Sequence, residues 1–245
     1  MYKIKIIYKT CIIGVLLLLN KHSVGQETSI HTLKIITKKD VLSLIKSYET
    51  KLNSVQQLVV ALNDNNSNNK AVLWGLERVN KRWKIKIRAT MASIGKNGFA
   101  LPGEKIEGDG KSPSGIFDLG QLYTYQNTVN TKLPYIQSTE QDKWIDDPNH
   151  EDYNKAIRGN TNAKSYEHLK LSSIDYKYCM VIEYNTQPVI KGKGSAIFFH
   201  VATPNYDPTA GCVAIKESDM NKVLLWLEPN KHKAILMGNK NYMLP

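Results

Sequence analysis

Apolar and polar residues alternate along much of the chain, which is typical of β-strands with one buried face. Residues 57–63 form an apolar run, and residues 71–79 and 83–91 predict two further strands. In the last of these, three apolar residues alternate with three basic ones: Trp83, Ile85 and Ile87 with Lys84, Lys86 and Arg88. The Asn-rich run 64–69 and the pair Asn80-Lys81 predict the connecting turns, because Asn tolerates left-handed backbone.

The remaining regular elements are few. Three later apolar segments predict strands: residues 178–184, 195–201 and 234–237. Helical spacing appears in residues 39–52, with Thr37 as a candidate N-cap, and in residues 217–227, which Pro229 ends. We expect the first helix to lie on the main body rather than form a core of its own.

Glycine, proline and aromatic residues mark the middle of the chain as irregular. Residues 95–120 contain nine Gly and Pro, which favours tight loops over helices. Residues 121–175 are polar and aromatic-rich, with a short helix expected at 165–170. The pattern predicts a mostly β fold of mixed sheets or a sandwich with few helices, as one domain spanning residues 55–245 and preceded by a lead-in with a short helix at 26–54.

The first 25 residues predict a signal peptide for export. Lys3, Lys5 and Lys9 precede the ten-residue apolar stretch Thr10–Leu19, which is too short to span a bilayer. Small residues then occupy the positions expected before a cut at Gln26. An uncleaved N-terminal anchor is the alternative. We expect an exported protein of the periplasm or cell envelope, with no stable membrane span after cleavage.

Composition narrows the class of protein without naming a function. The 245 residues are 42% hydrophobic and 22% charged, which is ordinary for a globular protein. Removing residues 1–25 deletes four lysines and no acid, so the formal charge falls from +11 to +7. This surplus suits an acidic polymer or is simply a solvated basic surface. The chain has no nucleic-acid-binding motif, and export argues against such a partner.

A strand-end histidine and a downstream cysteine carry the candidate chemistry. The predicted strand 195–201 delivers His200, and Thr209-Ala210-Gly211-Cys212 follows within a short loop. A thiolate needs little activation, and a nearby imidazole can accept its proton. Gly211 leaves no Cβ in the way, so backbone N–H groups can turn toward a developing oxyanion.

Three other interpretations of these residues stay open. Cys179 and Cys212 are the two cysteines beyond the signal region, and they could form a disulfide in an oxidising compartment. His200 could be a structural residue that ends a strand. His200 and Asp207 could also begin a zinc site, with more distant ligands at Glu228 and His232, although this leaves Cys212 without a role.

Two motifs in order resemble the L,D-transpeptidases with a YkuD-type catalytic domain. His200, Thr209, Gly211, Cys212 and Val213 match the family signature of a His followed by Ser/Thr-His-Gly-Cys and an apolar residue. Residues 108–117 resemble the family's upstream loop, Gly-x-x-x-Thr/Ser-Pro-x-Gly-x-Phe. The resemblance covers residues 55–240. The chain departs from the signature at Ala210, where the family has a second His, and at Ala214.

The resemblance implies a YkuD-like fold and a cysteine acyltransferase of peptidoglycan. In this interpretation Cys212 attacks a stem peptide, His200 is the base and Gly211 supplies an oxyanion donor. The product of transfer to an amine is a 3→3 cross-link, and transfer to water makes the enzyme a carboxypeptidase or hydrolase. A non-enzymatic wall-binding module is a further alternative. The resemblance implies no cofactor and no metal.

Substrate-binding residues are expected around the same motifs. Thr209 and Ala210 flank the nucleophile, and Lys96 and Lys111 are candidate contacts for stem carboxylates. Three residues of the irregular segment could line the same cleft: Asp146, Asp147 and Tyr153. The expected partners are peptidoglycan stem peptides, and the protein is expected to be a monomer.

Overall fold

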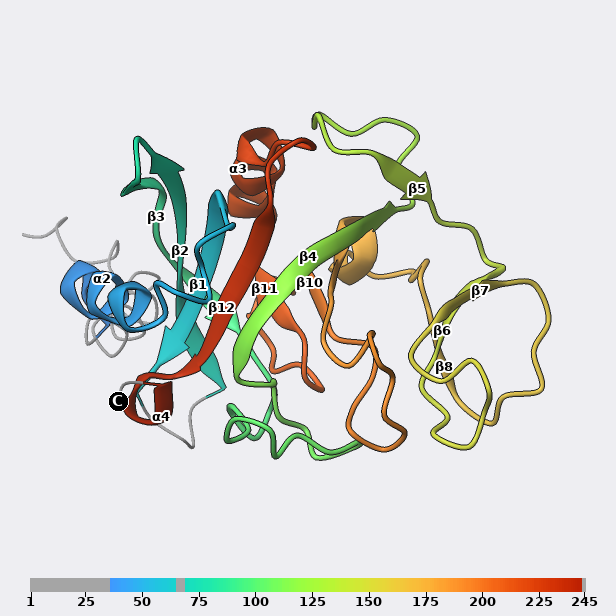
Figure 1. The fold of residues 1–245 in the computed structure, drawn as a ribbon. Coiled ribbons are helices and arrows are strands. Elements are labelled where there is room, and N and C mark those ends of the chain that lie inside the picture. Colours follow the sequence, from blue (N-terminus) through green and yellow to red (C-terminus); the bar gives the residue numbers. More distant parts are fainter. Residues whose placement is uncertain (1–35, 65–68, 244–245) are drawn as a thin grey trace, which may run out of the picture.

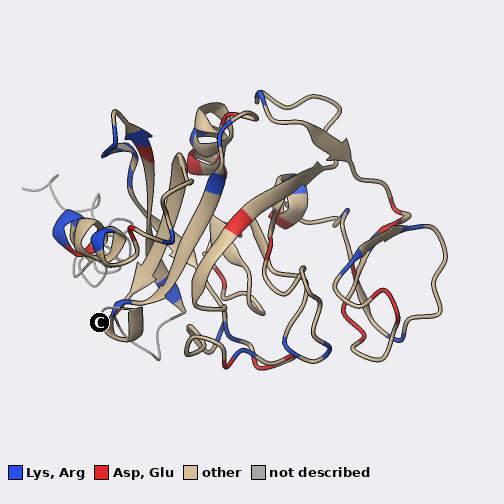
Figure 2. Cartoon of the chain, in the orientation of Figure 1, with Lys and Arg blue, Asp and Glu red and all other residues tan. Residues whose placement is uncertain are grey.

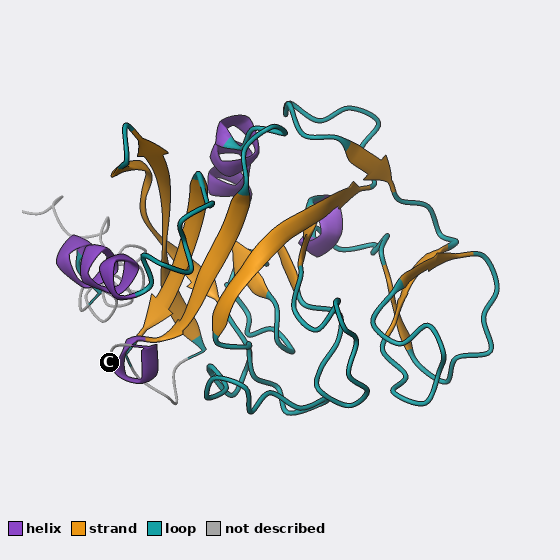
Figure 3. Cartoon of the chain, viewed as in Figure 1, coloured by secondary structure: helices purple, strands orange, loops and turns teal. Residues whose placement is uncertain are grey.

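The computed structural model describes residues 36–64 and 69–243, and it is built mainly of strands (Figures 1 and 3). The predicted signal peptide, the start of the lead-in and most of the Asn-rich turn lie outside the described residues. The strands are β1 (Gln57–Asn63), β2 (Lys70–Val79), β3 (Arg82–Ser93), β4 (Gly115–Thr124), β5 (Tyr135–Gln137), β6 (Asp142–Ile145), β7 (Ala156–Arg158), β8 (Tyr166–His168), β9 (Cys179–Ile182), β10 (Phe198–Val201), β11 (Val213–Ile215) and β12 (Lys233–Asn239). The helices are α2 (Lys38–Ser47), the 3-10 turn η2 (Asp175–Lys177), α3 (Glu217–Trp226) and α4 (Lys240–Met243).

The large sheet closes on itself into a mixed barrel. Its strand order is β12-β1-β2-β3-β11-β10-β9-β4, and β4 also pairs with β12, so these strands form a ring that β5 extends from β4. The parallel pairs β1–β12 and β10–β11 give it mixed character. The mostly β prediction with mixed sheets and few helices is therefore confirmed, and the sheet closes as a barrel.

Both the inner and the outer face of the barrel sheet are buried at β10, which explains why this strand is apolar at successive positions. In β10, Phe199 and Val201 belong to the cluster inside the barrel, whereas Phe198 joins a separate cluster with Cys179 and Cys212. Side chains alternate across a strand, so His200 shares the outer face with Phe198. The candidate catalytic residues thus lie outside the barrel core, on a wall that other segments cover.

Helix α3 and helix α2 cover different parts of this barrel. Buried residues of α3, including Met220 and Leu224, join the cluster inside the barrel. Helix α2 buries Val41, Leu44 and Ile45 against the outer faces of β1, β2 and β12. Burial of each such side chain contributes about 1.5–3 kcal/mol. The lead-in helix therefore packs on the main body, as predicted.

The start of α2 matches its sequence signal. Thr37 is the N-cap, and its side chain and that of Asp40 form a reciprocal capping box with the backbone. This arrangement satisfies two backbone N–H groups that a helix end leaves without partners. The helix ends at Ser47, earlier than the expected Leu52, although Leu52 is still fully buried.

A small second sheet replaces the helix expected at residues 165–170. Strands β7, β6 and β8 form an antiparallel sheet beside the barrel (Figure 1). Glu167 pairs with Trp144 in this sheet, so the short-helix prediction was wrong. Pairing with a distant strand outweighed the weak local helical signal. The short helix of this region is η2, directly before β9.

Basic residues lie on several parts of the surface, including the small sheet, where Lys143 belongs to β6 and Arg158 to β7. Figure 2 shows Lys and Arg on α2 and around the β2–β3 hairpin, on the side of the barrel opposite β6–β8.

Of the helices in residues 36–64 and 69–243, none has the length and apolar character needed to cross a membrane.

Candidate active site

Cys212 lies directly before β11, and it is buried in the lining of a cavity. The thiol donates to the backbone oxygen of Ala196 at 3.3 Å and accepts from the N–H of Phe198 at 3.4 Å. Its exposed fraction is 5%, and burial raises the pKa of the thiol well above its ordinary value. The resting residue is therefore a neutral thiol, and a base must take its proton when it attacks.

His200 is held in the form that such a base needs. Its Nδ1 lies 2.8 Å from the backbone oxygen of Val201, which can only accept, so Nδ1 carries the proton and Nε2 keeps its lone pair. Burial lowers the pKa of His200 below its usual value, while hydrogen bonding to the Val201 backbone and the charge and backbone of Asp175 oppose that shift. The ring is consequently neutral near neutral pH and able to accept a proton.

Cys212 and His200 share one cavity without being directly hydrogen-bonded in the described part of the chain. Strands β10 and β11 run parallel, and His200 lies opposite Ala214, two residues beyond Cys212. Both side chains line a cavity of about 280 Å³. A thiol that now donates to Ala196 must rotate toward His200 before transfer, and apo catalytic contacts are commonly looser than those of the reacting complex.

The turn before Cys212 is locked by Thr209. Its hydroxyl donates to the backbone oxygen of Cys212 at 2.7 Å and accepts from the N–H of Gly211 at 3.2 Å. The Gly211 N–H is thus occupied, and it would have to leave Thr209 to reach an oxyanion. A Cβ on Gly211 would lie 3.0 Å from the backbone oxygen of Lys111, so close packing also favours glycine here.

The upstream motif reaches this turn through Ser112. The Ser112 side chain is fully buried, donates to the backbone oxygen of Gly211 at 2.7 Å and accepts from the N–H of Gly95 at 3.0 Å. The N–H of Lys96 donates to the backbone oxygen of Thr209 at 2.8 Å. The upstream motif at residues 108–117 and the motif at residues 209–212 are therefore in direct contact at the turn before Cys212.

A tyrosine and a glutamate complete the buried surroundings of the thiol. Tyr176, from η2, donates from its hydroxyl to the carboxylate of Glu167, from β8. Its ring lies edge-on to His200 at 5.2 Å and to Phe198 at 5.6 Å between centroids. A hydrogen bond with the Tyr176 side chain lowers the pKa of Cys212, against the larger effect of burial. Glu167 and Tyr176 both line the cavity.

A buried ammonium group also lies close to the nucleophile loop. Lys105 is 4% exposed and pairs with Asp109 at 2.7 Å between Nζ and Oδ1. Its side chain passes 3.8 Å from where a Cβ on Gly211 would sit, and its charge lowers the pKa of Cys212. No sequence signal singled out this lysine, because only the fold brings it to the loop.

Comparison with known proteins identifies the domain. Residues 61–235 match the protein family described as YkuD, L,D-transpeptidase catalytic domain. The chain belongs to this family. Since the match spans most of the described barrel and both motifs, the family resemblance of the sequence is confirmed.

The chain is also similar to a solved structure. It is described as the helical cell shape determining protein Pgp2 from Campylobacter jejuni, with 14% identity and a TM-score of 0.36. The match covers 82% of this chain and 55% of Pgp2, so the chain spans about half the length of that structure. No curated protein gave a match.

The YkuD domain brings only some of the expected binding residues to the cavity. Thr209 and Ala210 line it, with Ala210 exposed at its rim. Lys96 and Lys111 are exposed and do not line it, although their backbones pack around the nucleophile loop. The cavity instead has Glu167, Asp175 and Asp207 as its carboxylates.

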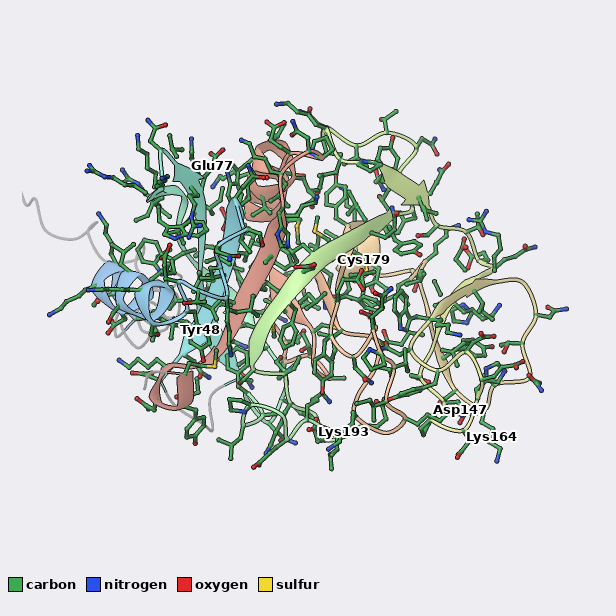
Figure 4. All side chains as sticks on the ribbon, in the orientation of Figure 1. Tyr48, Glu77, Asp147, Lys164, Cys179 and Lys193 are labelled. Carbon is green, nitrogen blue, oxygen red and sulfur yellow. The ribbon has the colours of Figure 1, made fainter. Side chains whose placement is uncertain are left out.

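The residues of the irregular segment also lie elsewhere. Asp147 accepts from the backbone N–H groups of Asn149 and Lys164 in an outer loop, where Figure 4 shows it beside Lys164. The Tyr153 hydroxyl is fixed by Glu107, and the Asp146 carboxylate is half-buried. These three residues therefore do not line the cavity of Cys212.

The disulfide and the zinc site find no geometric support in the described residues. Cys179 and Cys212 are both free thiols, and Cys179 is completely buried beside β4 (Figure 4). The Asp207 side chain is engaged by Thr203, and His232 lies 2.8 Å from Asp118, on a different part of the barrel. Within residues 36–64 and 69–243, no group of His, Cys, Asp and Glu is arranged to hold a metal ion.

Proposed function

We propose that this protein is an exported cysteine acyltransferase, an L,D-transpeptidase that acts on peptidoglycan stem peptides. The observation that carries the proposal is the placement of Cys212 and the neutral His200 in one cavity of a YkuD domain. A thiol and an imidazole at this position supply a nucleophile and its base, which is the minimum that acyl transfer through a thioester needs.

The first half of the reaction forms the acyl-enzyme. His200 Nε2 takes the proton of Cys212, and the sulfur attacks the carbonyl of the donor stem. Backbone N–H groups near Gly211 and Cys212 stabilise the negative charge on the carbonyl oxygen, which requires the Gly211 N–H to exchange its bond with Thr209. The imidazolium then protonates the leaving amine as the thioester forms.

The second half transfers the acyl group to an amine. Neutral His200 takes a proton from the incoming side-chain amine, and the new amide forms as Cys212 leaves as a thiol. The carboxylates of Asp175 and Asp207 at the cavity favour an approaching cationic group over an anionic one. They support an amine acceptor, and Lys96 and Lys111 stay predicted contacts for stem carboxylates outside the cavity. The chemistry requires neither a cofactor nor a metal.

The domain organisation of the chain fits this assignment. We propose residues 1–25 as a signal peptide that takes the protein to the periplasm or cell envelope, followed by the lead-in 26–54 and the catalytic domain 55–245. The contacts of α2 with the barrel support a lead-in that folds with the catalytic domain.

Mass spectrometry of purified muropeptides incubated with the mature protein tests the proposal. Cross-linked dimers are the expected product. Trimmed stems alone would show that water is the acceptor and that the protein is a carboxypeptidase or hydrolase. No change in the muropeptides, together with retained binding to them, would contradict an enzymatic role and favour a wall-binding module.

A further inference from the structure

The hydroxyl of Tyr176 lies where it can control the charge on the nucleophile. Tyr176 is 6% exposed, and its hydroxyl donates to Glu167. It lies in the same buried cluster as Cys212 and lines the same cavity, and its side chain lowers the pKa of the Cys212 thiol. Its ring is packed between Phe198 and His200, which fixes the position of the hydroxyl. A phenol has a single proton to donate, so it can serve only one of two acceptors at a time.

The proton on Glu167 decides which acceptor receives it. An ionised carboxylate can only accept, so Tyr176 then donates to Glu167. A protonated carboxyl group can donate to the phenol oxygen instead, and the phenol proton becomes available to the sulfur of Cys212. The charge of ionised Glu167 also disfavours a thiolate nearby.

We propose that Tyr176 is a further catalytic residue, which donates a hydrogen bond to the Cys212 sulfur as the thiolate forms, and that Glu167 is the positioning residue whose proton makes this donor available. The inference rests on the proposed acyl transfer. The proton balance is simple, since His200 takes the thiol proton while Glu167 and Tyr176 keep theirs. The sulfur then attacks with Tyr176 stabilising its charge until the thioester forms.

The surroundings of Glu167 support a proton on it at working pH. Burial is the largest effect that raises the pKa of Glu167 to about 7, and the carboxylates of Asp146 and Glu107 add to it. Hydrogen bonding with Tyr176 opposes the rise. Glu167 is therefore protonated in a substantial fraction of molecules near neutral pH.

Other titratable groups face the same cluster and act on it. Cys179 lies opposite His200 across β9 and β10, and burial raises the pKa of its thiol far above its usual value, so it stays neutral. The carboxylates of Asp175 and Asp207 line the cavity, and the charge of Lys105 lowers the pKa of Cys212. Among these groups, Glu167 is the acid in direct contact with the Tyr176 hydroxyl.

Alkylation of Cys212 by iodoacetamide across pH 6–9 tests the pair without using a substrate. Tyr176→Phe should slow alkylation at pH 7 by about tenfold, since a hydrogen bond to a charged group is worth roughly that factor or more. Glu167→Gln keeps a donor toward the phenol and removes the charge, so its alkylation at pH 8 should be faster than in the wild-type protein by about the same factor. In Tyr176→Phe/Glu167→Gln, most of that gain should be lost.

A matched control comes from Tyr178, which is buried on the barrel side of the same segment. Tyr178→Phe should leave alkylation unchanged, and thermal melting of each variant verifies folding. Equal alkylation rates in Tyr176→Phe and Tyr178→Phe, or slower alkylation in Glu167→Gln, would overturn the inference. Because alkylation does not involve stem peptides, a normal alkylation pattern without muropeptide products would contradict the proposed function and leave the Tyr176–Glu167 pair standing.

Discussion

Replacing Ser112 by Ala should loosen the turn that holds Cys212 while leaving the Cys212 thiol itself unchanged. The variant removes a fully buried hydroxyl that donates to Gly211 at 2.7 Å and accepts from Gly95 at 3.0 Å. A buried carbonyl and a buried N–H both lose their partner, at roughly 1–3 kcal/mol each. We therefore expect the free energy of unfolding to fall by about 2–6 kcal/mol, which corresponds to about 4–24 °C in melting temperature.

The effect on catalysis should exceed the effect of stability alone. With the Gly211 carbonyl released, the Cys212 turn can shift, and a displacement on the order of 1 Å can cost about a hundredfold in rate. From its family we expect a carbapenem to acylate Cys212. The assay is the rate of that acylation, followed by intact mass at a temperature where the variant is folded. We expect a decrease of about tenfold to a hundredfold.

Ser114→Ala is the matched control for this prediction. Ser114 is also buried in the same loop, but its hydroxyl donates to Ala100 at 2.6 Å and makes no hydrogen bond to the nucleophile turn. It should lower stability and leave the acylation rate of folded protein unchanged. Equal acylation rates in both variants would refute the argument that Ser112 positions Cys212.

Three further predictions concern His200, the thiols and the lead-in helix. In the wild-type protein the pKa of His200 is lower than in the unfolded chain, so the unfolded chain takes up the proton at a higher pH. The free energy of unfolding should therefore fall as pH drops below about 6.5, and urea titrations of His200→Gln should lose this dependence. The same variant should also be alkylated at Cys212 more slowly at pH 7. Cys179, with no exposed surface, should alkylate only on unfolding, as peptide mapping of the labelled protein would reveal. Leu44→Ala in α2 should cost about 2–5 kcal/mol by urea unfolding because it leaves a cavity, while acylation of the folded variant stays at the wild-type rate; an unchanged unfolding curve would contradict the packing of α2 on the barrel.

The elements that the sequence predicted well are those whose signal is local. The strand at Gln57–Asn63 has the expected limits, because an uninterrupted apolar run fits a strand buried on both faces. The N-cap at Thr37 has the expected role because capping depends on residues one turn apart. The closure of the barrel by β4 and β12 could not be predicted, since it joins strands more than a hundred residues apart in the chain.

Only the site residues that belong to a recognisable sequence motif could be predicted. His200 and Cys212 stood out by residue type and spacing, and the structure places both in one cavity. Glu167 and Tyr176 come from an irregular segment without a motif, and only the pairing of β8 with β6 brings Glu167 to the thiol. Lys111 stays a predicted binding residue, and the contact of its motif with the turn comes from Ser112, which no sequence signal singled out.

The central claim is that Cys212 carries the acyl group, and mapping the covalent adduct tests it most directly. The mature protein is incubated with a tetrapeptide stem or a carbapenem, trapped at low pH, digested and sequenced by tandem mass spectrometry. The account predicts one adduct, on Cys212, that is absent in Cys212→Ala, at least a thousandfold slower in Cys212→Ser and unaffected by chelators. That reduction corresponds to an increase of about 4 kcal/mol in the activation free energy of acylation. An adduct on another residue, acylation of Cys212→Ala at the wild-type rate, or loss of acylation with a chelator and its return with zinc would contradict it.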